Sequence, residues 1–366
     1  MSNRNRPLVI AVAAVAVVAV AGGGMLAAAR GPESQTGAAA APLSVPTTPP
    51  VTLPASKVVI DATKLPTGRT PQVSYLRGRT VQGGISSPVK VPGSVPVEAV
   101  ARLWDTTMAM EVPNANSSSL VVLDEAGKVS QRLPGIDSLV TSADGNAAAF
   151  ATGGRYTGHD GGTVHFRSTD GKDLTLDHAR AREIEVLAVV DRSVYLSSRP
   201  EDSKTPNLYR WDVDASAVAE PLKVARPVAV SPDGTLAAGL PVFTDSGLCS
   251  VVTDLAKNRQ QWRTCQYRLD NFSPRNAFVI GYAPNAGSPY GESTASALDA
   301  KTGRVLRTWL AESLRNAVPE DDDHVLFEWH NQAGPESRSA VVRCTVSTGQ
   351  CELASPLSPE PLLLGS

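Results

Sequence analysis

The feature that most constrains the fold of this chain is a short strand–turn–strand unit that recurs along it. Two apolar runs flank a polar turn in three segments: "LVTSADGNAAAFA" (139–151), "VAVSPDGTLAAGL" (228–240) and "DNFSPRNAFVIGY" (270–282). Aligning them places Ser142, Ser231 and Ser273 in register, at separations of 89 and 42 residues. A period near 44 residues therefore leaves one degenerate copy around residue 186.

A second, independent series of turns recurs with the same period. Each turn joins two alternating strands later in the unit, and six of them lie at or near Gly127, Gly171, Ser216, Asn258, Gly303 and Gly349. Their successive spacings are 44, 45, 42, 45 and 46 residues, and Gly83-Gly84 fits one further step towards the N-terminus. Two series at one spacing indicate seven copies of a unit with four short strands.

A repeat of about 40–45 residues with four strands is typical of a β-propeller blade. One small sheet cannot bury both of its faces, whereas blades packed around an axis cover each other. The 29 Gly and 28 Pro fit the many turns of such a fold. We therefore predict an all-β chain, a β-propeller over residues 57–366 with seven four-stranded blades. Six blades is the alternative, because the first unit departs from the pattern and is a candidate to share its sheet with the C-terminal end.

The Ser-Pro-Asp-Gly turn is expected to be structural. Pro fixes φ at the second position, Asp bonds back to the backbone, and Gly accepts a positive φ. With "SPDG" at 231–234 and the hairpin "DAKTGR" at 299–304, the chain resembles the WD40-like repeats of bacterial exported propellers, the TolB-like class. The resemblance covers about residues 57–356 and implies a propeller that serves as a scaffold for protein contacts.

The N-terminal region predicts export. Residues 1–7 contain two arginines, and residues 8–29 carry no charge over 22 positions. About 20 apolar residues span a bilayer as a helix, and positive charge before them favours a cytoplasmic N-terminus. We expect a single-pass anchor in the cell membrane with the bulk of the chain extracytoplasmic. The alternative is a signal peptide cleaved after Ala27-Ala28-Ala29, which would give a secreted protein. Residues 30–56, rich in Pro and Ala, are expected to form a disordered linker.

Four cysteines in an exported chain predict disulfide bonds. They allow three pairings, and the repeat selects one of them. Cys249 and Cys265 bracket the outer hairpin of one unit, while Cys344 and Cys351 bracket "TVSTGQ" in the last unit. Facing positions on adjacent antiparallel strands are close enough for a disulfide. We predict the pairs Cys249–Cys265 and Cys344–Cys351, since spacings of 16 and 7 residues lack the Cys-x-x-Cys clustering of a metal site.

Charge and side-chain patterns argue against several classes of function. The chain has 34 Lys plus Arg against 36 Asp plus Glu and no long basic run, so we predict no nucleic-acid binding. The run "PEDDDH" (319–324) is the best candidate for a cation site, but it occupies a turn of the repeat and lacks the spacing of a calcium loop. His159 and His165 have no third ligand nearby. We predict no metal, no cofactor and no catalytic residues, and favour a binding protein over an enzyme.

Four loops fall between the second and third strands of their units and are therefore expected on one face of the disc: 155–162, 197–207, 281–293 and 330–339. Loops on a rigid scaffold carry function more often than strands do. Their candidate binding residues are Tyr156, His159, Asn207, Tyr282, Asn285, Tyr290 and Asn331. The five tryptophans are expected mostly in the core between blades.

These features predict a membrane-tethered, extracytoplasmic β-propeller that binds an envelope or membrane protein, or another cell-envelope component, through its loop face. The alternative is an exported hydrolase with its site at the central channel. A hydrolase needs acidic or His side chains from several units at equivalent ends of the inner strands. Those positions carry mainly Val, Ala, Phe and Leu, which favours binding.

Overall fold

The structure is a computed structural model that describes residues 56–365, except 85, 154–160, 180, 216–218, 245–246, 286–290 and 332–336. They all belong to one compact unit, Leu53–Ser366. The predicted membrane segment 8–29 and the linker 30–56, apart from Ser56, lie outside the described residues. Within the described part, the only helix is the 3-10 helix η1 (Ala62–Lys64), and no helix there is long and apolar enough to cross a membrane.

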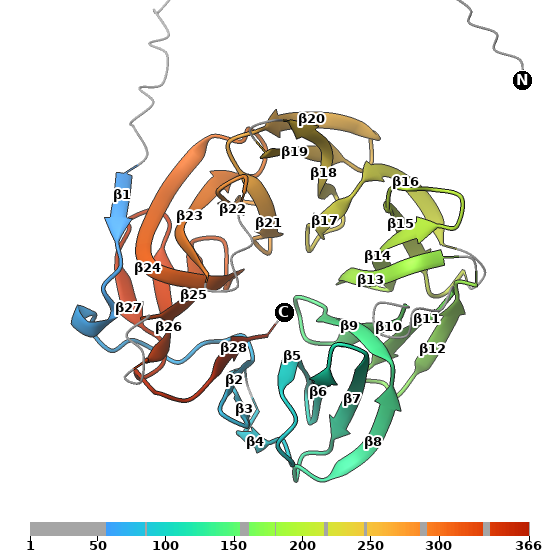
Figure 1. Ribbon diagram of the computed structural model, residues 1–366, viewed down its shortest axis with the longest axis horizontal. Coiled ribbons are helices and arrows are strands. Elements are labelled where there is room, and N and C mark those ends of the chain that lie inside the picture. The colour runs from blue at the N-terminus through green and yellow to red at the C-terminus, as the bar shows by residue number, and fades with distance from the viewer. Residues whose placement is uncertain are drawn as a thin grey trace, which may run out of the picture. The chain divides into compact units, whose positions relative to one another are not determined.

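Small antiparallel sheets are arranged around a ring (Figure 1). Four of them follow the chain in order, each with four strands from the axis outwards. The first contains β5 (Val97–Leu103), β6 (Thr106–Asn114), β7 (Ser117–Leu123) and β8 (Val129–Pro134). The second contains β9 (Ile136–Thr141), β10 (Ala147–Thr152), β11 (Thr163–Ser168) and β12 (Asp173–Asp177). The third contains β13 (Ala181–Val190), β14 (Ser193–Pro200), β15 (Asn207–Asp212) and β16 (Glu220–Ala225). The fourth contains β17 (Pro227–Val230), β18 (Leu236–Thr244), β19 (Gly247–Asp254) and β20 (Arg259–Thr264).

A larger sheet of eight strands follows. Its strands are β21 (Arg268–Phe272), β22 (Phe278–Tyr282), β23 (Glu292–Asp299), β24 (Val305–Pro319), β25 (His324–His330), β26 (Ser339–Thr345) and β27 (Cys351–Leu353), with β1 (Ser56–Val59) paired in parallel to β24. The 15-residue strand β24 serves twice: residues 305–314 pair with β23, and residues 313–319 pair with β25. One long strand thus joins two four-stranded halves.

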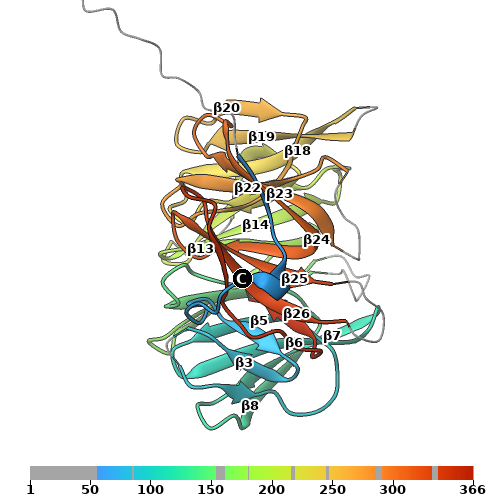
Figure 2. The ribbon, with the colours of Figure 1, turned by 90° about the vertical axis from the view of Figure 1, so that its left-hand side faces the viewer.

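The two ends of the chain close the ring within one sheet. The C-terminal strand β28 (Leu362–Leu364) pairs with β2 (Tyr75–Arg77), which continues into β3 (Thr80–Gln82) and β4 (Val89–Lys90). The predicted sharing of the first sheet between the two termini is therefore confirmed. Residues 56–73, the N-terminal strap, reach this sheet along the eight-stranded one, because β1 pairs with β24 and Thr67 bridges Leu353. Figure 2 shows β1 and η1 on this side of the ring.

The core lies between neighbouring sheets, so inner strands are apolar on both faces. Along β10, Ala148 and Phe150 pack against the β5–β8 sheet, while Ala147, Ala149 and Ala151 pack against the β13–β16 sheet. This is the period of two expected for a strand whose faces meet different partners. Four alanines in six residues allow the sheets to approach closely around the axis.

The recurrent serine of the turn has a structural role in all three copies. Its Oγ accepts a hydrogen bond from the backbone N–H five residues later: Ala147 to Ser142 (2.9 Å), Leu236 to Ser231 (2.9 Å) and Phe278 to Ser273 (3.1 Å). In two copies the hydroxyl also donates to the turn aspartate, Asp144 or Asp233. Gly145 and Gly234 adopt a positive φ of about 69° that favours glycine. The structural interpretation of the turn is confirmed.

Both predicted disulfides are present. Cys344 and Cys351 face each other on β26 and β27, and Cys249 on β19 is bonded to Cys265, which follows β20. No free cysteine occurs among the residues that the structure describes. Each bond joins adjacent outer strands of its sheet, as the repeat predicted.

Candidate functional site

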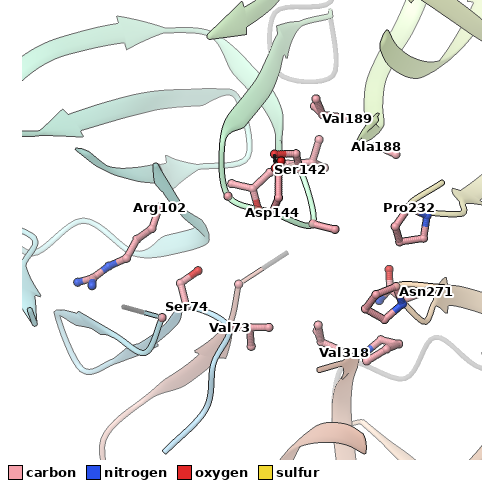
Figure 3. A pocket seen from close by; sticks show the side chains of 18 of the residues that line it. Val73, Ser74, Arg102, Ser142, Asp144, Ala188, Val189, Pro232, Asn271 and Val318 are labelled. Atoms are coloured by element: carbon pink, nitrogen blue, oxygen red, sulfur yellow. Dashed lines mark hydrogen bonds between the residues drawn. The ribbon is translucent and has the colours of Figure 1, made fainter. Parts of the chain in front are cut away.

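A cavity of about 380 Å³ lies at one end of the ring axis (Figure 3). Its wall is built from the ends of the inner strands and the turns that follow them. The contributing segments are 72–74, Arg102 with Trp104, 140–145, 187–189, Val230 with Pro232, 271–274 and 318–320. Every sheet of the ring therefore contributes to one wall.

Most side chains around this cavity are apolar or neutral. Figure 3 shows Val73, Ala188, Pro232 and Val318 facing the same opening from four different sheets. Among the polar residues, Asn271 donates its side-chain amide to the Ala317 carbonyl (3.1 Å). Pockets of this kind, mainly apolar with a few placed polar groups, are the usual form of a binding site.

The charged side chains of the wall are already engaged within the protein. Arg102 donates to four backbone carbonyls of the segment 81–87, at 2.8–3.3 Å. Asp144 accepts hydrogen bonds from Ser142 (2.5 Å) and from Asn146 (2.8 and 3.0 Å). Burial raises the pKa of Asp144, but these hydrogen bonds outweigh it and hold the pKa below its ordinary value. The carboxylate is thus kept ionised within its own turn.

The third charge of the wall, Glu320, belongs to a buried ion-pair network. Its side chain is 0% exposed and accepts from Arg343 (Nε 2.5 Å, Nη2 2.8 Å), from Arg69 (3.0 Å) and from the Gln72 backbone N–H (2.7 Å). Arg343 also donates to the carbonyls of Arg69 and Thr70 in the N-terminal strap. Glu320 therefore fastens the strap to the end of β24.

The "PEDDDH" run behaves as a turn, although it is not simply solvated. Glu320 is the buried residue just described. Asp321 accepts from His324, Asp322 from Arg275 of the preceding turn, and Asp323 from Ser347. No group of three or more His, Cys, Asp or Glu side chains arranged to hold a metal ion occurs in the described part of the chain.

The four predicted binding loops belong to the other end of the sheets. In an antiparallel meander, the turns after the first and second strands lie at opposite edges. The cavity is lined by turns after the first strands, whereas the four loops connect β10 to β11, β14 to β15, β22 to β23 and β25 to β26. The loops therefore share one end of the strands, and the axial cavity opens at the end opposite to them.

The seven predicted binding residues are only partly placed. Tyr156, His159 and Tyr290 lie outside the described residues. Asn285 is exposed, Asn207 is half-buried at the start of β15, and Asn331 closes its own loop by accepting from the Arg338 N–H (2.6 Å). Tyr282 is 3% exposed and packs in the core, where burial raises the pKa of its hydroxyl well above the ordinary value. Its ring is thus not presented at the surface.

Sequence reasoning missed acidic residues on the inner strands. Asp270 on β21 and Glu185 on β13 belong to two sheets separated by the β17–β20 sheet. Burial raises the pKa of Asp270, Arg268 opposes that rise, and the nearby charge of Glu185 adds to it. Carboxylates with raised pKa values are candidates for acid–base chemistry. The recurrence of an acidic residue near the start of several inner strands, as at Glu98 and Asp137, was the signal available in the sequence.

The tryptophan expectation holds for three of the five residues and is wrong for one. Trp211, Trp309 and Trp329 are buried between sheets, and Trp262 is half-buried. Trp104 is 59% exposed, because it occupies the two-residue turn between β5 and β6 instead of a strand. The sequence signal was the step from the apolar run ending at Leu103 to the polar Asp105.

The sheets, their ring arrangement and the shared first sheet define a β-propeller. No protein-family model and no curated protein matches the chain. Similar solved structures include an uncharacterized protein from Listeria monocytogenes EGD-e, with 10% identity, TM-score 0.49 and coverage of 76% of this chain and 91% of that one. TolB from Acinetobacter baumannii is similar at 14% identity and TM-score 0.41, with coverage of 80% of this chain and 63% of that one. The β-propeller domain of the Trilobed protease from Pyrococcus furiosus is similar at 9% identity and TM-score 0.46, with coverage of 72% of this chain and 99% of that one. The propeller assignment rests on the strand pairings of this chain.

Proposed function

We propose that this protein is a seven-bladed β-propeller that binds a segment of an extracytoplasmic partner, a protein or another component of the cell envelope, at the mouth of its central channel. Seven blades follow if the eight-stranded sheet is divided within β24, at residues 313–314, where both neighbouring strands pair with it. The proposal includes tethering to the cell membrane through residues 8–29, whose uncharged run is the support for it.

The observation that carries the binding proposal is the composition of the axial cavity. All sheets supply its wall, apolar side chains are the most numerous in it, and Arg102, Asp144 and Glu320 each have internal hydrogen-bond partners. A ligand therefore gains contacts by burying apolar surface, and no charged group has to be released first. An apolar stretch of a partner chain that enters the mouth fits these requirements.

The test compares the two ends of the ring in the full-length protein. A photo-crosslinking amino acid is placed at Ala143, an exposed turn residue in the cavity wall, and in a second variant at Asn285, an exposed residue of the opposite loop face. We expect one stoichiometric adduct from position 143 in cells. The same adduct should be lost when Pro232, across the mouth, is replaced by Arg. An adduct only from position 285 would assign binding to the loop face and overturn the proposal.

The hydrolase alternative has one specific observation in its favour. Asp270 and Glu185 approach one another from different sheets, and the pKa of Asp270 is raised by burial. A pair of interacting carboxylates of which one has a raised pKa is an arrangement that hydrolases use. This alternative predicts that Asp270→Asn abolishes a hydrolytic activity while leaving the crosslink from position 143 intact.

A further inference from the structure

A second hollow, the lateral groove, lies at the same end of the ring as the axial cavity. Its volume is about 880 Å³, and it is lined by parts of the segments 86–89, 103–107 and 167–173. These segments come from three neighbouring sheets: the closing sheet with β3 and β4, the β5–β8 sheet and the β9–β12 sheet. The groove is separate from the axial cavity except at Ser86 and Trp104, which border both.

Trp104 is the feature of this groove that core packing does not explain. Its side chain is 59% exposed, while Trp211, Trp309 and Trp329 are at most 3% exposed. Its backbone has a φ of +48°, a conformation that is unfavourable for bulky residues and usually taken by Gly or Asn. An exposed indole held in a strained turn indicates that the ring is retained for an external contact.

The indole is also fixed in place by the neighbouring sheet. Its Nε1–H donates to Oδ1 of Asn146 (3.0 Å), and Asn146 is in turn held by Asp144, which accepts from its side-chain amide (2.8 Å) and its backbone N–H (3.0 Å). On the other side, the Ser86 hydroxyl donates to the Trp104 carbonyl. The ring is thus held by one neighbouring sheet and its backbone by another, so the indole loses little freedom when a ligand stacks on it.

The remainder of the groove is polar, with three carboxylates, of Asp105, Glu125 and Asp173, and one cation, Arg167. Hydroxyl groups are contributed by Ser86, Ser87 and Thr169. Arg167 is matched by Asp173 in a bidentate pair, with Nε to Oδ1 at 2.6 Å and Nη2 to Oδ2 at 2.7 Å. Walls that carry hydroxyl and carboxylate groups around one flat aromatic ring suit a ligand that has both an apolar face and many hydroxyl groups.

We propose that the lateral groove is a saccharide-binding site in which one sugar ring stacks on Trp104. The C–H face of the ring covers the indole, and the sugar hydroxyls exchange hydrogen bonds with the hydroxyl-bearing wall and with the exposed carboxylates of Asp105 and Glu125. This site lies beside the channel mouth proposed above, and the two hollows share Ser86 and Trp104.

The experiment titrates the full-length protein, in a detergent without a sugar headgroup, with maltotetraose, cellotetraose and tetra-N-acetylchitotetraose. Binding is measured by calorimetry and by tryptophan fluorescence. We expect at least one of these sugars to bind and to change the fluorescence, because Trp104 is the most exposed tryptophan. Trp104→Gly should weaken that binding at least about tenfold, which corresponds to about 1.4 kcal/mol.

Trp104→Gly is a favourable test variant because Gly adopts the φ of +48° without strain, so the variant is expected to fold. The matched control is Trp262→Phe, since Trp262 also donates its indole N–H, to the Ala300 carbonyl (2.8 Å), but lies on β20 away from the groove. The control should bind the sugar as the parent protein does. Failure of all three sugars to bind, or equal binding by Trp104→Gly, would overturn the proposal. Binding of an oligolysine peptide instead of the sugars would also overturn it, in favour of a cation on the indole.

Discussion

Replacing Glu320 by Ala is expected to cause one of the largest losses of stability available to a single substitution in this protein. The carboxylate is 0% exposed and accepts four N–H groups, from Arg343, Arg69 and Gln72. Without it, Arg343, whose side chain is 2% exposed, keeps only Glu352 as an anionic partner at 2.6 Å. Removing one member of a buried ion pair costs about 3–5 kcal/mol, because the other charge stays buried.

At about 2–4 °C per kcal/mol for a large domain, this loss corresponds to a decrease in Tm on the order of 10 °C. Urea unfolding followed by tryptophan fluorescence measures the free energy directly. The strap should also become sensitive to limited proteolysis between residues 56 and 73, since Glu320 and Arg343 together hold Arg69, Thr70 and Gln72. The double substitution Glu320→Leu with Arg343→Met should regain much of the loss, because neither charge is then left alone.

The control for this prediction is Arg275→Ala. Arg275 pairs with Asp322 in the adjoining turn, but its side chain is 87% exposed, and Asp322 keeps the hydrogen bond from the Arg275 backbone N–H when that side chain is removed. Its removal should leave the urea midpoint almost unchanged. If Glu320→Ala were no more harmful than Arg275→Ala, or if the strap stayed resistant to protease, the network would not be what fastens the strap to the ring.

Three further predictions concern the turns, the disulfides and the channel. Ser231→Ala should lower the free energy of unfolding by about 1–2 kcal/mol, since the buried N–H of Leu236 loses its partner, while Ser231→Thr should retain most of it. The two disulfides close loops with separations of 16 and 7 residues. Loop-closure entropy therefore predicts that replacing both cysteines by Ser lowers the free energy of unfolding by about 3 kcal/mol for Cys249–Cys265 and by about 2 kcal/mol for Cys344–Cys351. Equal losses in denaturant titrations would contradict that account. The folded-state pKa of Asp270 is raised, so ionising this carboxylate destabilises the folded protein. This destabilisation is absent below the unfolded pKa of about 4 and grows as the pH rises through the folded pKa. Asp270→Asn should therefore gain Tm relative to the parent from pH 4 upwards. A Tm difference that widened towards acid would show the opposite sign and refute that assignment.

The architecture was predictable because it repeats. Ser142, Ser231 and Ser273 recur with the unit, and their hydroxyls satisfy the same backbone N–H group each time, so the spacing carried both the turn and the strand count. The disulfide pairing followed from the same register. The repeat did not reveal that β24 is continuous through two units. The strand is continuous because its sequence has no turn between Ala311 and Leu314.

The sites were less predictable, because they depend on which end of a strand a residue occupies and on partners from other sheets. Glu320 lies in an acidic run whose sequence predicts a solvent-exposed turn. Its partners Arg69 and Gln72 are about 250 residues away in the sequence, so the run itself does not reveal its burial. Tyr282 lies in a loop-like context but ends β22 with its ring inward. Binding at the predicted loop residues stays a prediction, and Tyr156, His159 and Tyr290 lie outside the described residues.

The chemistry of the inner strands changes along their length, from the turns that follow them to the middle of the strands. At the turn end, the strands finish in tight Ser-containing turns, which place small and apolar residues such as Ala143 and Pro232 around the axis. In the middle of the same strands, Asp270 on β21 and Glu185 on β13 interact, and the charge of Glu185 is one reason for the raised pKa of Asp270. A partner that binds by burying apolar surface is therefore directed to the turns, whereas a cationic group or a reaction that needs carboxylates is directed to the middle of the inner strands. Crosslinking at Ala143 and titration of Asp270 address these two places separately, so their results distinguish a binding module from a hydrolase without a known ligand.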